Sequence, residues 1–245
     1  MTYREIRKNY QHNFGWDSVL VDAYTTLLSP LVTKVCLKLR LIPNVITVLM
    51  IVSGVMGGLI FALPPLWCKI LGTVLIHLWY VFDCSDGEVA RITKRYSKFG
   101  TEIDYTAHVI DHPFIMFGFA CSLLQSGINT VIAIALPAAV AVLDLVFRSM
   151  ATFGLIYDLK IPPEREDTTA SNDAAGAAAK RVSGRTVITF FINILVHLPN
   201  LALIFPIVWF ISPVAACIYM TAVLAMLVLY VPVVILSWLK RIVRI

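Results

Sequence analysis

A short stretch of the sequence concentrates carboxylates between two apolar runs. Residues 83–112 hold six of the fifteen acidic residues, namely Asp83, Asp86, Glu88, Glu102, Asp104 and Asp111. A charged side chain at membrane depth costs about 2.5 kcal/mol or more, so such a cluster indicates a functional site.

The spacing of these residues predicts a metal site. Asp83 and Asp86 lie three apart and share one face of a helix, and Asp104 and His108 lie four apart on the next. Two antiparallel helices joined by a basic turn would bring both faces together. Three carboxylates in one pocket repel one another unless a cation lies between them, and all-oxygen ligation suits Mg²⁺, Mn²⁺ or Ca²⁺.

The stretch also contains a motif. It reads Asp83-x2-Asp86-Gly87-x2-Ala90-Arg91-x8-Gly100-x3-Asp104-x3-His108. This pattern resembles the signature of the CDP-alcohol phosphatidyltransferases, integral membrane enzymes that make phospholipid headgroup linkages. The last position differs, because His108 stands where the family has a fourth aspartate that acts as the catalytic base.

The resemblance implies a reaction and its ligands. A CDP-linked donor, either CDP-diacylglycerol or a soluble CDP-alcohol, binds to one or two Mg²⁺ or Mn²⁺ ions, and an acceptor hydroxyl attacks its phosphorus and expels CMP. The metal ligands are expected to be Asp83, Asp86, Asp104 and His108. The CDP moiety is expected to contact Asp86, Gly87, Ala90, Arg91 and Gly100. The resemblance also implies a homodimer.

His108 and Asp111 are the predicted catalytic pair. A neutral imidazole can take a proton from a hydroxyl at neutral pH, because its reference pKa is about 6.5. Asp111, three residues later, is placed to accept from the other ring nitrogen and fix the tautomer. His112 could share that role or pack, and His108 could instead ligate metal or orient the substrate.

The acceptor site is less defined. Arg148 and Arg185 could bind an acceptor phosphate, because arginine forks match phosphate geometry; Lys180 and Arg181 lie close to Arg185 in the sequence. Alternatively, these cations hold helix ends at the lipid headgroups. Glu88 and Glu102 are expected to flank the site without ligating metal.

Composition fixes the broad class. Apolar residues make up 59% of the chain, and the mean hydropathy is +0.82, which predicts a membrane protein. The net charge of +5 comes from basic residues between hydrophobic runs, which favours membrane lipids rather than nucleic acid as partners. The five cysteines include no C-x-x-C pair, so they support neither a disulfide framework nor a zinc site.

The predicted fold is all-α and integral to the membrane, with six transmembrane helices after an N-terminal amphipathic helix. That first helix covers residues 18–41, and Ser29-Pro30 is expected to bend or break it. The six spans are residues 45–63, about 67–91, about 99–126, 129 to about 156, about 186–211 and 213 to about 239. Residues 157–185 are expected to form a charged loop. The predicted domains are residues 1–42, cytoplasmic and interfacial, and the catalytic transmembrane residues 43–245.

Six spans place both termini on one side, together with nineteen of the twenty Lys and Arg residues; only Lys69 lies opposite. The positive-inside rule makes that side the cytoplasm, so a multi-pass protein of the cell membrane with a cytoplasmic active site is expected. A carrier is disfavoured because the acidic cluster is not near the midplane. A non-catalytic membrane scaffold with the same fold is the remaining alternative.

Overall fold

The computed structural model describes residues 2–11, 19–160 and 198–242. These ranges form helices joined by short turns and contain no strand, which confirms the all-α prediction. The helices are α1 (Tyr3–Asn9), α2 (Val19–Lys38), α3 (Pro43–Phe61), α4 (Leu66–Thr93), α5 (Gly100–Gln125), α6 (Thr130–Lys160), α9 (Leu198–Ile211) and α10 (Pro213–Ile242).

Five of the described helices, α3, α4, α5, α6 and α10, are long and apolar enough to cross a membrane. The 19 residues of α3 extend about 28 Å, close to the thickness of the hydrocarbon layer. The fifth predicted span begins outside the described residues, and its described part is the shorter apolar helix α9. Many large apolar side chains on these helices are exposed, as expected of a multi-pass membrane protein.

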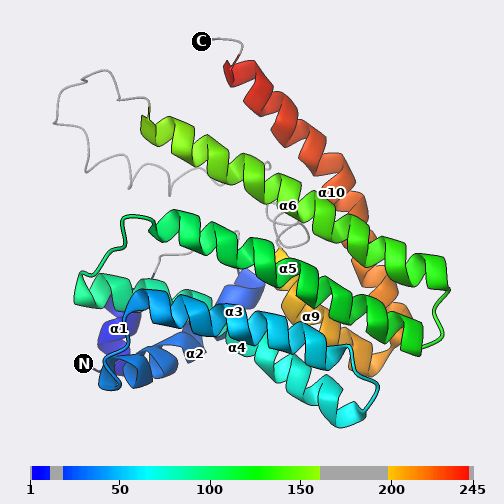
Figure 1. The fold of residues 1–245 in the computed structure, drawn as a ribbon, viewed down its shortest axis with the longest axis horizontal. Coiled ribbons are helices and arrows are strands. Elements are labelled where there is room, and N and C mark those ends of the chain that lie inside the picture. Colours follow the sequence, from blue (N-terminus) through cyan, green and yellow to red (C-terminus); the bar gives the residue numbers. More distant parts are fainter. Residues whose placement is uncertain (1, 12–18, 161–197, 243–245) are drawn as a thin grey trace.

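Helix α3 packs against both α4 and α5, α6 packs against α5, and α10 packs against α6 and α9. Figure 1 shows α3, α4, α5 and α6 running along the long axis of the molecule. Small residues allow the close approach of α3 and α5. A Cβ on Gly58 would collide with the backbone of Phe114, and one on Gly118 would collide with the Gly58 carbonyl. Such contacts are typical of membrane helices, whose association depends on close packing.

The N-terminal region contains one helix that the sequence analysis did not predict. Helix α1 begins with a capping box, in which the Thr2 hydroxyl accepts from the Glu5 amide and the Glu5 carboxylate accepts from the Thr2 amide. The latter hydrogen bond lowers the pKa of Glu5 below its usual value. The Tyr3 hydroxyl donates to the Leu27 carbonyl at 2.9 Å, which holds α1 against α2.

Helix α2 continues through Pro30, so the proline does not break it. Its amphipathic character is evident from burial. Thr25, Ser29 and Thr33 are fully buried, whereas Leu31 and Val35 are more than half exposed. Helix α6 runs past its predicted end at about residue 156 and continues to Lys160.

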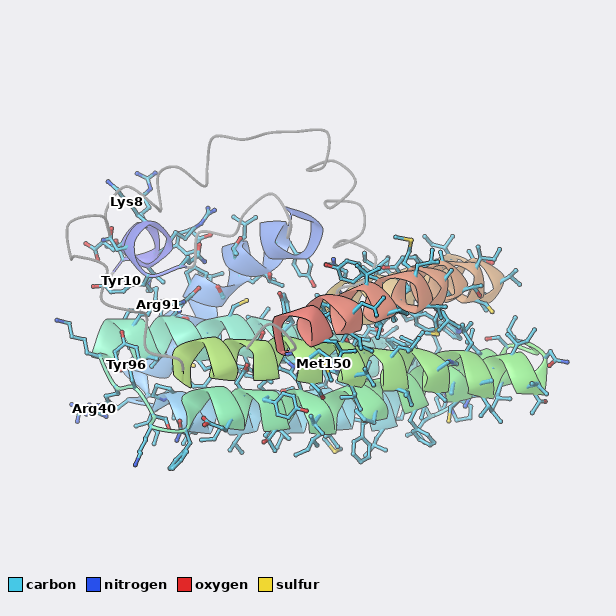
Figure 2. All side chains as sticks on the ribbon, turned by 90° about the horizontal axis from the view of Figure 1, so that it is seen from above. Lys8, Tyr10, Arg40, Arg91, Tyr96 and Met150 are labelled. Carbon is cyan, nitrogen blue, oxygen red and sulfur yellow. The ribbon has the colours of Figure 1, made fainter. Side chains whose placement is uncertain are left out.

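Basic residues and turns gather at one end of the long helices. Lys94 has a left-handed backbone (φ 54°) and ends α4, so the chain turns back into α5. Figure 2 shows Lys8, Arg40, Arg91 and Tyr96 at this same end of the molecule. The arrangement agrees with a common side for the N-terminal region, the α2–α3 turn and the α4–α5 turn.

Candidate active site

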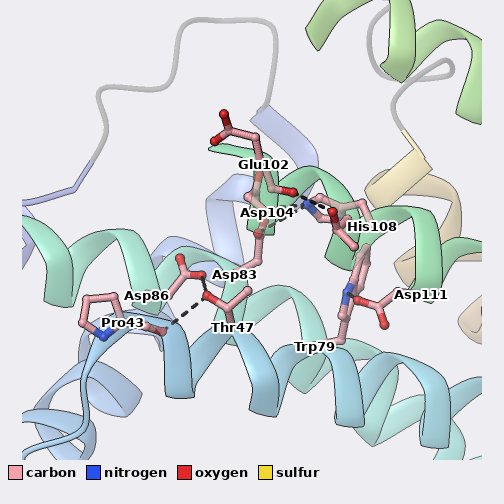
Figure 3. Close-up of polar contacts among 10 residues, drawn as sticks. Pro43, Thr47, Trp79, Asp83, Asp86, Glu102, Asp104, His108 and Asp111 are labelled. Atoms are coloured by element: carbon pink, nitrogen blue, oxygen red, sulfur yellow. Dashed lines mark hydrogen bonds and ion pairs between the residues drawn. The ribbon is translucent and has the colours of Figure 1, made fainter. Parts of the chain in front are cut away.

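Asp83 on α4 and two residues of α5, Asp104 and His108, meet at the end of the bundle that carries the basic turn (Figure 3). His108 Nε2 lies 3.5 Å from Asp83 Oδ1 and 3.5 Å from Asp104 Oδ1. The His108 side chain is only 4% exposed, whereas those of Asp83 and Asp104 are 22% and 50% exposed. The group is therefore open on its carboxylate side and closed behind the imidazole.

These three side chains fit a divalent cation. Each offers one ligand atom, and these atoms all lie within 4.8 Å of one another. Ligands of one ion at about 2.1 Å lie roughly 3–4 Å apart, so separations of 3.5 Å suit joint ligation. Two carboxylates and an imidazole suit Mn²⁺ better than an all-carboxylate set does, because imidazole is the softer ligand.

Asp86 does not join the three-residue group, although it was expected to ligate metal with them. Its Oδ2 accepts from the Thr47 hydroxyl of α3 at 2.7 Å. The same hydroxyl lies 3.3 Å from the Pro43 carbonyl oxygen. Figure 3 shows Asp86 on the side of α4 that faces the start of α3.

The hydrogen bond expected between His108 and Asp111 is not formed. Asp111 Oδ2 instead accepts from Trp79 Nε1 at 2.8 Å. The His108 Nδ1 atom and Asp111 Oδ1 are buried without a partner among the described residues. A buried indole N–H needs an acceptor, and Asp111 supplies it. Gly54 makes room for this pair, because a Cβ there would lie 2.8 Å from Asp111 Cγ and 2.8 Å from Trp79 Cδ1.

Comparison with known protein families identifies the family to which this chain belongs. A model of the CDP-alcohol phosphatidyltransferase family matches residues 40–239, which include the whole motif. The chain belongs to this family. It is therefore a transferase that uses a CDP-alcohol donor and a hydroxyl acceptor. Family members use divalent metal ions, and the Asp83, Asp104 and His108 cluster could bind one. A comparison with curated proteins gives no match.

The CDP-alcohol phosphatidyltransferase motif also lines a cavity of about 180 Å³ beside Asp83. Its lining residues are Gln11, Thr26, Tyr80, Asp83, Cys84, Gly87, Glu88 and Arg91. Arg91 was expected to contact the CDP moiety. Its Nε donates to the Tyr10 carbonyl oxygen at 2.5 Å, and its Nη1 lies 3.1 Å from where a Cβ on Gly87 would be. One donor of Arg91 thus holds the N-terminal segment, while the Nη atoms cover Gly87.

The remaining motif positions differ in their surroundings. Gly100 begins α5 and is exposed, and a Cβ there would meet only Ser97 Cβ at 3.8 Å. Ala90 is half-buried on α4. Gly100 offers room near the backbone, which is what close approach of a nucleotide requires.

Glu88 is a structural carboxylate in this protein. It is 2% exposed, and its two oxygens accept from Ser29 at 2.5 Å and from Thr33 at 2.6 Å. These contacts fasten α2 to α4. Glu102, in contrast, is exposed and points away from the cluster in Figure 3. Neither residue belongs to the metal-ligand group.

A second buried pair lies behind the cluster and was missed by the sequence analysis. His112 Nδ1 donates to Asp144 Oδ2 of α6 at 2.6 Å, and both residues are buried. The signal was an aspartate inside an apolar span, which requires a partner. Arg148 is half-buried one turn further along α6, close enough for its charge to act on Asp104 and Asp144. Arg185, the other expected acceptor residue, lies outside the described residues.

Proposed function

We propose that this protein moves a substituted phosphate from a CDP-linked donor to an acceptor hydroxyl with release of CMP, in a reaction that requires a divalent metal ion. The observation that carries the proposal is the meeting of Asp83 with Asp104 and His108 from two antiparallel helices. No hydrophobic packing argument explains two carboxylates facing one another at the end of apolar helices. A cation between them does, because it removes their repulsion.

Asp83 and Asp104 are proposed to hold Mg²⁺ or Mn²⁺, with His108 as third ligand and Asp86 beside them. A bound ion would neutralise the charge that develops on the phosphoryl oxygens. Thr47 keeps the Asp86 carboxylate in place through its 2.7 Å hydrogen bond. The Asp86 carboxylate is then proposed to serve either the ion or the CDP moiety, as the motif implies.

His108 has two possible roles, and one nitrogen cannot perform both at once. As a ligand it uses Nε2, which lies equally far from the two carboxylates. As a general base it takes the proton of the attacking hydroxyl. The placement of Nε2 between the carboxylates favours ligation. Asp111 then acts on His108 only indirectly, because it is bonded to Trp79, which packs edge-on against the His108 ring.

We also propose the substrates, the orientation in the membrane and the oligomeric state. The donor is CDP-diacylglycerol or a soluble CDP-alcohol, and the product is a phospholipid or glycolipid headgroup linkage. Arg148 is proposed to bind an acceptor phosphate, because its guanidinium makes no hydrogen bond or ion pair to the described residues. The active site and both termini face the cytoplasm, and two copies form a homodimer.

The test is a CMP-release assay on the full chain in nanodiscs with membrane lipid extract. CDP-diacylglycerol, CDP-choline, CDP-ethanolamine and CDP-polyols are supplied in turn with Mg²⁺ or Mn²⁺. We expect CMP from at least one donor, and we expect EDTA to abolish its release. Binding of the donors without CMP release would indicate a scaffold. Neither binding nor release would indicate a carrier, and either result would overturn the proposal.

A further inference from the structure

The segment that follows α1 lies against the motif face of α4, far from it in sequence. Arg91 Nε donates to the Tyr10 carbonyl oxygen at 2.5 Å. The next residue, Gln11, donates from Nε2 to the Thr26 carbonyl oxygen at 2.7 Å and to Glu88 Oε1 at 3.1 Å. Residues of α4 and α2 thus hold both Tyr10 and Gln11, and Gln11 becomes part of the cavity wall beside Asp83.

The orientation of the Gln11 amide follows from the chemistry of its partners. A backbone carbonyl and a carboxylate oxygen only accept hydrogen bonds, so the atom facing them must be the NH₂ group. Ser29 Oγ, 3.3 Å from the same nitrogen, uses its own proton on Glu88 at 2.5 Å. Because the amide is planar, Oε1 points away from this network. It accepts no hydrogen bond from a described residue.

We propose that Gln11 is a specificity residue of the donor pocket, whose fixed Oε1 accepts a hydrogen bond from the exocyclic amino group of the cytosine base. This inference rests on the proposed function. Pockets for whole drug-sized ligands are about 300–1,000 Å³, so the cavity of about 180 Å³ suits one fragment of a nucleotide. Asp83 and Arg91, which the motif assigns to the metal and the CDP phosphates, line the same cavity as Gln11, which leaves Gln11 for the base.

An acceptor with a fixed direction discriminates between pyrimidines. Cytosine presents an amino donor where uracil presents a carbonyl acceptor, and a carbonyl facing Oε1 would leave two acceptors opposed without a proton. A site built to accept from a donor group rejects an analogue that lacks it, because the buried acceptor is then unpaired. Ribose hydroxyls both donate and accept, so they would not require the amide to be held in one orientation.

The experiment measures the affinities of CDP and UDP by titration calorimetry on the full chain in nanodiscs with Mn²⁺. We expect the wild-type protein to bind CDP more tightly than UDP. Gln11→Ala should weaken CDP binding about 3- to 10-fold, the effect of one lost hydrogen bond, and should change UDP binding less. Asn9→Ala is the matched control, since Asn9 is exposed at the end of the same short helix.

The ratio of the two affinities is measured on one preparation, so a partly unfolded fraction does not alter it. A Gln11→Ala protein with the wild-type ratio would overturn the inference, whether both affinities stay the same or fall together. That result would leave the proposed function intact, because the wild-type protein would still bind CDP and release CMP. If the wild-type protein binds no CDP, the proposed function fails and this inference fails with it.

Discussion

The two ends of the helical bundle both contain buried charged groups, but they differ in how far the hydrogen bonding of these groups is completed. At the end without the motif, Lys69 is 1% exposed and donates to the Phe61 carbonyl at 2.6 Å and to Gln125 Oε1 at 2.7 Å. Its ammonium also lies 5.3 Å from the centre of the Trp209 ring. One cation therefore connects α3, α4, α5 and α9.

At the motif end, Asp83, Asp104 and His108 face one another without such completion. The carboxylates of Asp83 and Asp104 are held by the same imidazole, at distances longer than a good hydrogen bond. His108 Nδ1 is buried and has no partner in the described part of the chain. The difference separates two uses of buried charge. Lys69 completes the hydrogen bonding of its surroundings, whereas the proposed ligand group leaves polar atoms without partners, as expected where an ion is to bind.

Asp83→Asn is the most severe test of this contrast. The asparagine has the same shape but cannot help to hold a cation, so CMP release should fall roughly 100- to 1,000-fold or more. The melting temperature should stay the same or rise, because a carboxylate facing Asp104 has been removed. Both quantities are measured on one nanodisc preparation, and Mn²⁺ binding is followed by electron paramagnetic resonance.

Glu102→Gln is the matched control, because Glu102 is an exposed carboxylate at the start of α5 that points away from the cluster. It should release CMP within about twofold of wild type, as exposed substitutions usually have small effects. The contrast between the two ends would be wrong if Asp83→Asn melted well below wild type, since Asp83 would then contribute to the fold.

Lys69→Met should affect stability rather than activity, the opposite of Asp83→Asn. Methionine keeps most of the length of the side chain but leaves the Phe61 carbonyl and Gln125 without their donor. Hydrogen bonds to charged groups contribute about 1.5–3 kcal/mol, so the melting temperature should fall by several degrees. CMP release per folded molecule should be unchanged. Lys34→Met, at an exposed position of α2, controls for loss of a positive charge. A Lys69→Met protein that melts normally but has lost CMP release would show that Lys69 takes part in the reaction.

The sequence predicted the helices well because their cause is local. An uncharged run of nineteen residues, 45–63, can satisfy its backbone in a membrane only as a helix, and α3 covers Pro43–Phe61. The same holds for the pairing of Asp104 with His108, since neighbours four apart in a helix lie on one face. Pro30 does not break α2, whose contacts with α4 outweigh one lost backbone hydrogen bond.

Partners distant in sequence could not be predicted. Asp111 lies three residues from His108, but its carboxylate bonds to Trp79, which is 32 residues away on another helix. Gln11 and Glu88 are separated by 77 residues, and nothing in the spacing of either connects them. Which rotamer a buried carboxylate adopts depends on the donors that neighbouring helices present. The capping box of Thr2 and Glu5 is a local signal that could have predicted the start of α1.

His108→Asp gives the smallest expected effect and tests which role His108 performs. The substitution restores the four-aspartate form of the motif and replaces an imidazole with a harder oxygen ligand. If His108 is a metal ligand, the ratio of CMP release with Mn²⁺ to that with Mg²⁺ should fall about fivefold, because carboxylates favour Mg²⁺ more than imidazole does. The ratio is measured at saturating concentrations of each ion, so a change in overall rate does not enter it. An unchanged ratio with a lower rate would instead assign His108 to proton transfer, and the cation would then be held by carboxylates alone.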